Sequence, residues 1–324
     1  MTGLPPLDWT LAERLGRRFA RSGPIAGDRP GPTGLSVGEV RDAVASLHAA
    51  AQRAIGLVAD ASGLTMSRQP PVYAVDRAGW AQANAQIGRR LFAAIGHPPP
   101  HGLGAKVLGR ANAVAAAGAT RWFGSKVLGQ YDPFHPGGRL LLVVPNLLAA
   151  ERALGVPPGD FRLWACLHEQ THAVQFGAAP WLLDHLVRLV SRVAADSGVQ
   201  WLGKLAPHPD ADAVRALEET MAAMSLLEGH ADVMMDLAGK GVIGSWPQLR
   251  AAADASHQRS RSGWLARLGV LSKAEQYATG AGFCRAVLAE GGTAALNRAF
   301  AGAWALPSPA EIADPAAWLG RVHG

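Results

Sequence analysis

Residues 167–176 read LHEQTHAVQF, a stretch in which two histidines flank a glutamate at helical spacing. Four residues advance an α-helix by about 400° and about 6 Å, so the side chains of His168 and His172 project from one side of a helix. Two imidazoles one turn apart can converge on a single ion, with Glu169 beside the water that such an ion holds. The stretch therefore predicts either a zinc site on a helix, with Glu169 as general base, or an ordinary packed helix that carries two histidines by chance; a further ligand on another helix would favour the zinc site.

The residues around this stretch predict where the helix begins and ends. Asp160 follows two prolines and a glycine and is predicted as the N-cap, whereas Gly177 and then Pro180 predict the C-terminal end. The face opposite the histidines is mainly apolar and is expected to anchor the helix in the core. That face consists of Leu163, Trp164, Leu167, Thr171 and Val174.

A catalytic zinc ion takes three protein ligands and leaves one position open. Residues 212–239 predict a long helix in which Glu228 and Asp232 share a stripe with apolar or small residues. Carboxylates on a core-facing stripe are costly unless they are paired or bind a cation. Glu228 is therefore predicted as the third ligand, and Asp232 as the acceptor for the outer nitrogen of a ligating histidine. His230 points about 200° away from Glu228 and is the rival ligand if the helix faces the other way.

Helical periodicity dominates the remaining sequence. Ser36 and Glu39 have the spacing of a capping box ahead of a long amphipathic segment. Further helices are expected at residues 78–95 and 104–117 and over most of the chain after residue 147. Short strands are expected at residues 71–75 and 139–144, with a structured loop at residues 128–138. The pattern predicts a mainly α fold with a small β element beside the histidine-bearing helix.

The chain is long enough to bury a sizeable core without a metal or disulfide staple. Its 324 residues are 49% hydrophobic and 17% charged, which is typical of a globular protein. We expect an N-terminal helical half, residues 1–138, packed on a catalytic half, residues 139–324, as one continuous unit.

Cysteine content and apolar runs indicate the compartment. Cys166 and Cys284 are too few for a disulfide framework, which favours a reducing cytoplasm. The N-terminus lacks the apolar run of an export signal. The longest apolar stretch, residues 140–150, is about half the roughly 20 residues that a bilayer span needs. We therefore expect a cytoplasmic protein without a membrane span.

The charge balance is mildly basic, with 31 basic and 25 acidic residues and a net charge of +6. A basic stripe near the N-terminus is interpreted as a solvated helix face. It consists of Arg14, Arg17, Arg18 and Arg21. No zinc-finger spacing or interleaved aromatic pattern indicates specific binding of nucleic acid. Binding of nucleic acid or anionic lipid by the basic surface is an alternative that predicts steep salt dependence, and the dispersed charge argues against it.

The motifs together resemble zincins of the gluzincin type, in which a later helix supplies a glutamate after the two histidines. More narrowly, residues 145–176 and 225–236 resemble the bacterial type 2 zincin-like metallopeptidase family, whose members are often labelled as associated with deazaflavin coenzyme biosynthesis. Residues 128–134, LGQYDPF, and 275–283, EQYATGAGF, extend the resemblance over most of the chain.

The resemblance implies a predominantly helical zinc hydrolase that acts on a peptide or protein and holds one zinc ion per chain. It implies His168, His172 and Glu228 as ligands and Glu169 as catalytic base. One departure from better-known gluzincins is the long gap before Glu228, which holds a helix-rich insertion that could cover the cleft.

Peptide hydrolysis usually needs a second donor for the oxyanion. Tyr277 is the first choice for this donor, Tyr131 the second and His185 the third. The competing interpretation is a non-catalytic interaction or scaffold protein that keeps zinc as a structural pin. Structural zinc sites normally fill all four positions, often with cysteine, and have no use for a base such as Glu169.

Overall fold

The computed structural model describes most of the chain. The described residues are 4–21, 35–97, 101–195, 199–200, 204–205, 210–261 and 272–324. For residues 199–200, 204–205, 256–261 and 272–279 only the backbone is described.

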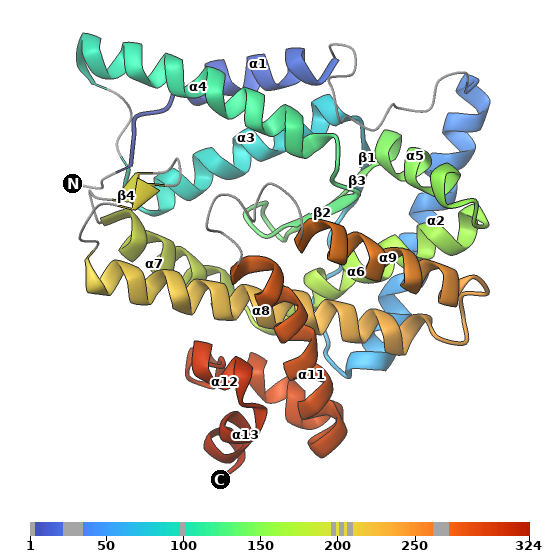
Figure 1. Cartoon of the computed structure of the whole chain (residues 1–324). Coiled ribbons are helices and arrows are strands. Elements are labelled where there is room, and N and C mark those ends of the chain that lie inside the picture. The colour runs from blue at the N-terminus through green and yellow to red at the C-terminus, as the bar shows by residue number, and fades with distance from the viewer. Residues whose placement is uncertain are drawn as a thin grey trace.

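Helices make up most of the described chain, which confirms the mainly α prediction (Figure 1). They are α1 Trp9–Arg21, α2 Val37–Ser62, α3 Arg77–Ala94, α4 Gly102–Gly124, α5 Val144–Leu154, α6 Pro158–Ala178, α7 Trp181–Ala195, α8 Ala211–Gly239, α9 Trp246–Arg261, α11 Ser272–Asn297, α12 Pro309–Ala313 and α13 Pro315–His323, with 3-10 turns η1 Arg298–Phe300 and η2 Ala303–Ala305. Within the described residues, none of these helices is long and apolar enough to cross a lipid bilayer.

A three-stranded sheet lies near the centre of the molecule (Figure 1). Strands β1 Val72–Val75 and β3 Arg139–Val143 are parallel, and β2 Gly129–Asp132 pairs with the other side of β3 in antiparallel register. A separate two-stranded ribbon joins β4 Val199–Gln200 and β5 Lys204–Leu205. Strand β2 falls where a loop was predicted, because its four residues become a strand only by pairing with β3.

Local sequence signals account for two helix starts. The Ser36 Oγ accepts from the Glu39 amide at 3.2 Å, and the Glu39 carboxylate accepts from the Ser36 amide at 2.7 Å, which confirms the capping box of α2. Helix α6 begins at Pro158, so the prediction of Asp160 as its N-cap is wrong. Proline suits the first helical turn because its missing N–H would have no partner there. Asp160 instead accepts hydrogen bonds from the Ser245 amide and hydroxyl, at 2.7 and 2.8 Å.

Strand β3 is buried on both faces of the sheet, since its successive residues point to opposite sides and residues 140–143 are all buried. Leu140 and Leu142 join the main core with α2, α5 and α6, whereas Leu141 and Val143 pack against Trp80 and Ala83 of α3. The main core therefore contains side chains from both sides of the predicted boundary at residue 138. A second core packs α8 against α11 and the C-terminal helices.

Candidate metal centre

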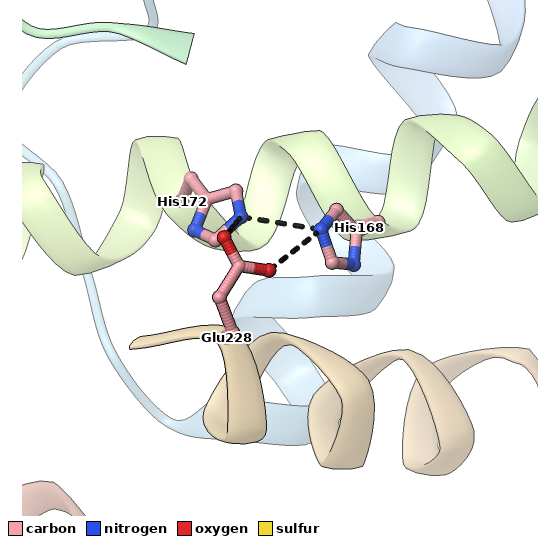
Figure 2. Close-up of side chains that lie close together, drawn as sticks. All are labelled: His168, His172 and Glu228. Atoms are coloured by element: carbon pink, nitrogen blue, oxygen red, sulfur yellow. Dashed lines mark hydrogen bonds and ion pairs between the residues drawn. The ribbon is translucent and has the colours of Figure 1, made fainter. Parts of the chain in front are cut away.

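Helix α6 has the two-sided character that the sequence predicts. Four of the five residues predicted on its apolar face are fully buried, and Trp164 is partly buried against the main core. The four are Leu163, Leu167, Thr171 and Val174. His168 and His172 project from the other side of the helix, toward α8 (Figure 2).

Helix α8 brings Glu228 to the two histidines (Figure 2). The His168 and His172 Nε2 atoms are 3.2 Å apart. One Glu228 carboxylate oxygen lies 3.4 Å from the His168 Nε2, and the other lies 3.7 Å from the His172 Nε2. The two histidines share one helix, whereas Glu228 lies 56 residues after His172 in the sequence. The fold therefore brings a distant donor to a local pair.

These separations fit a tetrahedral zinc ion. Zinc bonds of about 2.0–2.1 Å at tetrahedral angles place two donor atoms about 3.3 Å apart. The observed 3.2, 3.4 and 3.7 Å lie close to that value. Among the described residues, no further His, Cys, Asp or Glu joins this group of donors. Three protein donors and a fourth, non-protein ligand make up a catalytic zinc site.

The electrostatics also favour a cation at this position. Burial disfavours the charged form of His168, but the Glu228 carboxylate outweighs burial and raises the pKa of His168 to about 9. Burial lowers the pKa of His172. The negative charge of Glu228 therefore stabilises a positive charge between the two rings. A proton on His168 provides that charge, and a bound metal ion would provide it in the same way. The His168 and Glu228 side chains are each 29% exposed, so a ligand can reach the donors.

Glu169 lies next to this group and is held against strand β2. Burial raises the pKa of Glu169 to about 7, although nearby His168 and a hydrogen bond from the Tyr131 backbone amide both act to lower it. A base is most effective when its pKa lies near the working pH. Gly129 makes the close approach feasible, because a Cβ atom there would lie 2.7 Å from the Glu169 Cγ.

Gln175, which the sequence analysis missed, orients His172. The His172 Nδ1 lies 2.9 Å from the Gln175 Oε1. The Gln175 amide nitrogen donates to the Leu227 carbonyl at 2.8 Å, and since a carbonyl only accepts, that bond fixes which end of the amide faces His172. The His172 Nδ1 must then carry the proton, which leaves the lone pair of its Nε2 for a metal. Gln175 lies three residues after His172, on the same side of the helix, and this spacing is the sequence signal that could have identified it as the partner of His172.

His230, the rival ligand, does not join the donors. It is fully buried, its Nδ1 lies 3.0 Å from the Gln175 Nε2, and its ring meets Phe300 edge to face. Burial lowers the pKa of His230 to about 3, so this histidine is neutral. Helix α8 therefore presents Glu228 to the site and turns His230 into the core behind Gln175, as the offset of about 200° between them requires.

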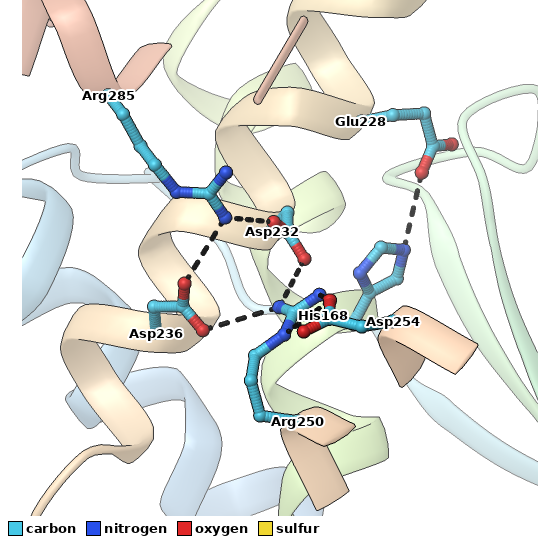
Figure 3. A network of polar contacts seen from close by, with 7 residues as sticks. All are labelled: His168, Glu228, Asp232, Asp236, Arg250, Asp254 and Arg285. Atoms are coloured by element: carbon cyan, nitrogen blue, oxygen red, sulfur yellow. Dashed lines mark hydrogen bonds and ion pairs between the residues drawn. The ribbon is translucent and has the colours of Figure 1, made fainter. Parts of the chain in front are cut away.

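Asp232 has partners other than a histidine ring. Its two carboxylate oxygens lie 2.6 Å from the guanidinium groups of Arg250 and Arg285, which also contact Asp236 (Figure 3). Within the described part of the chain, no hydrogen bond joins Asp232 to His168 or His172. The structure thus places Asp232 in an ion-pair network between α8, α9 and α11 and gives the ring-orienting contact to Gln175. The sequence analysis did not identify these partners of Asp232, because the two arginines lie on later helices and are not close to Asp232 in the sequence.

The three residues considered as oxyanion donors differ in what the structure says of them. Tyr277 belongs to α11, but its side chain lies outside the described residues. The Tyr131 ring packs near Phe176, and its hydroxyl lies against Gly138. His185, on α7, contacts Trp181. Tyr131 thus reaches the site through its backbone amide, and the donor remains a prediction.

The insertion before Glu228 is only partly described. Its first helix, α7, packs beside α8, and the ribbon of β4 and β5 follows. Residues 196–198, 201–203 and 206–209 lie outside the described residues. The expectation that the insertion covers the cleft stays a prediction.

Comparison with known proteins agrees with the site. The family model for zincin-like metallopeptidases matches residues 7–319. A crystal structure from Chloroflexus aurantiacus, described as that of a candidate hydrolase with a novel fold, superimposes with a TM-score of 0.73 at 26% sequence identity. The match covers 98% of this chain and 99% of that chain. No match was found among curated proteins. A donor triad spaced for zinc, a buried glutamate beside it and a family match over nearly the whole length lead to one conclusion: the chain belongs to the zincin-like metallopeptidase family.

Proposed function

We propose that the protein is a zinc-dependent hydrolase that cleaves peptide bonds with Glu169 as general base. The observation that carries the proposal is the triad of His168, His172 and Glu228, with donor separations of 3.2 to 3.7 Å, directly beside a buried carboxylate. Two imidazoles and one carboxylate are a donor set that zinc peptidases use.

The residues divide the work as follows. When bound, a zinc ion supplies a Lewis acid that acidifies water and polarises a carbonyl group. His168, His172 and Glu228 would hold it, with the His172 ring fixed by Gln175. Glu169 accepts the proton of the attacking water on its carboxylate and then donates it to the leaving amine. A pKa of about 7 lets the same carboxyl group act in both directions near neutral pH.

The sheet edge beside the site favours an extended peptide as substrate. Strand β2 is at the edge of the sheet, since the strand order is β1-β3-β2. The Tyr131 amide donates to Glu169, so the outer edge of β2 faces the base. An extended peptide can add to such an edge through main-chain hydrogen bonds, which would align its carbonyl groups along the site. We assign oxyanion stabilisation to Tyr277 as part of this proposal.

The test begins with the metal content of the purified protein, measured by elemental mass spectrometry. About one zinc ion per chain is expected in the wild type, and a loss is expected in both His172→Ala and Glu228→Ala. A peptide library then provides a substrate, on which Glu169→Gln should lose activity while it keeps its zinc. If both variants lose zinc but the zinc-loaded wild type hydrolyses no peptide, the result would favour the scaffold interpretation. Full zinc content in Glu228→Ala would refute the ligand assignment.

A further inference from the structure

Helix α4 exposes an apolar face that nothing in the described chain covers. Five of the twelve large hydrophobic residues that are exposed in the described chain lie on this one helix. They are Leu103, Val107, Leu108, Val114 and Phe123. Leu103 is 81% exposed and Val107 is 59% exposed, which far exceeds what packing in a folded core leaves accessible. Scattered apolar residues are normal on surfaces, but Leu103, Val107 and Val114 fall within about 40° of one another around the helix axis, and such a stripe marks an interaction site.

The positive charge of the chain is concentrated in the same layer. Helices α1, α3 and α4 carry ten lysines and arginines and one acid, Glu13, a formal charge of +9. The whole chain carries +6, so the remainder of the sequence sums to −3. Helix α4 itself contains no acidic residue. The basic character of the protein therefore belongs to one layer rather than being spread over its surface.

The charged and apolar surfaces adjoin each other. Helices α1 and α4 lie side by side at one edge of the molecule (Figure 1). The Asp8 amide, just before α1, donates to the Gly109 carbonyl at 3.0 Å, and the Asn112 side chain donates to the Pro6 carbonyl at 2.8 Å. The exposed basic residues of the two helices are Arg14, Arg18, Arg21, Lys106 and Arg110. Lys106 and Arg110 lie three residues after Leu103 and Val107 on α4, and the other three arginines lie on the neighbouring helix α1.

We propose that this α1–α4 face binds the surface of a lipid bilayer that contains anionic lipids, with α4 lying in the interfacial plane. An amphipathic helix with apolar side chains on one face and basic residues at its edge uses both features at such an interface. A second copy of the chain would bring two strongly positive faces together, which charge repulsion opposes. Nucleic acid would pair with the arginines but leave the α4 side chains unused. The lipid interface is the partner that complements both the charge and the apolar surface.

The experiment measures sedimentation of the full-length protein with vesicles. One set of vesicles is pure phosphatidylcholine, which has no net charge. The other contains about 30% phosphatidylglycerol, an anionic lipid. We expect binding to the anionic vesicles only, weakened by salt. Arg14→Glu with Arg21→Glu should lower the partition coefficient by roughly 25-fold or more, since each basic residue near an anionic surface contributes about fivefold. Leu103→Ser with Val107→Ser should lower it by about tenfold or more.

Matched variants control for net charge and for loss of apolar surface. Arg152→Glu with Arg188→Glu gives the same net charge at exposed positions on α5 and α7. Leu217→Ser with Val242→Ser removes the same two side-chain types from exposed positions elsewhere. Both controls should bind vesicles as the wild type does. Circular dichroism and thermal unfolding confirm that each variant folds.

Three results would overturn the proposal. The first is no binding to the anionic vesicles at low salt. The second is loss of binding in the arginine variant but not in the α4 variant, which would indicate a polyanion such as nucleic acid. The third is a dimer in light scattering that Leu103→Ser with Val107→Ser dissolves, which would identify a second copy as the occupant.

Discussion

Replacing Gln175 with leucine tests whether the second layer of the site controls zinc binding. The Gln175 side chain is fully buried and has three polar partners, His172, Leu227 and His230, at 2.9, 2.8 and 3.0 Å. Leucine has a similar size but can neither accept from the His172 Nδ1–H nor donate to the other two groups. The substitution therefore removes the polar contacts and leaves the packing volume nearly intact.

The expected effects follow from these three contacts. Each buried hydrogen bond contributes about 0.5–1.5 kcal/mol, and each partner left without one costs about 1–3 kcal/mol. We expect the free energy of unfolding to fall by about 3–6 kcal/mol. Loss of an outer partner of a ligating histidine typically weakens metal affinity by about 10–100-fold, and we expect the same for zinc here. Gln175→Glu should retain affinity close to wild type, because a carboxylate still accepts from His172.

The assay is competition for zinc with a chromophoric chelator, paired with urea unfolding of the zinc-free protein. Gln170→Leu is the matched control, since Gln170 is also fully buried on α6 but donates to the Ala51 carbonyl of α2 at 3.2 Å. We expect it to lower stability without weakening zinc affinity. Equal zinc affinity in Gln175→Leu and the wild type would refute the orienting role. Equal losses in the Gln175 and Gln170 variants would show that general destabilisation explains the effect.

Glu169→Gln should lower the hydrolysis rate at least about 100-fold, with zinc content unchanged by elemental analysis, and an active variant would contradict the general-base role. In Gly129→Ala the new Cβ would lie 2.7 Å from the Glu169 Cγ, so displacement of the carboxylate should lower kcat by about 10–100-fold. Gly118→Ala, where a Cβ meets nothing within 4 Å, should leave kcat unchanged, and similar rates in both glycine variants would refute the steric argument. The last prediction concerns pH: burial lowers the pKa of His230 to about 3, whereas an unfolded chain has a histidine pKa of about 6.5. Between these values the unfolded chain binds the additional proton at His230, so this histidine makes the free energy of unfolding of the zinc-free protein fall as pH decreases, by at most about 1.4 kcal/mol per pH unit. The raised pKa of Glu169, about 7, acts in the opposite direction, so the test compares urea unfolding of the wild type and His230→Phe at several pH values. The difference in the free energy of unfolding between the two proteins should change with pH, and a pH-independent difference would contradict the assignment.

Features that depend on one helix or one turn were predictable from the sequence. The pairing of His168 with His172 follows from the helical repeat, as does the burial of the opposite face of α6. The capping box of Ser36 and Glu39 needs only residues three apart. Glu228 could be predicted as a ligand from the sequence, because a carboxylate on a core-facing stripe needs a cationic partner.

Features that depend on contacts between distant segments came only from the tertiary structure. Strand β2 exists through its pairing with β3, and that pairing brings the Tyr131 amide and Gly129 to Glu169. Asp232 lies one turn from Glu228, yet Arg250 and Arg285 arrive from two later helices and hold it in an ion-pair network.

The sequence by itself determined which side chains share a helix face, because the backbone repeat sets those positions whatever surrounds the helix. The packing of α6 against α8 decided which of those faces meet. It set Glu228 opposite the histidines and turned His230 inward to Gln175. Relative placement of helices depends on the shape and burial of many side chains at once, and no single spacing in the sequence records it.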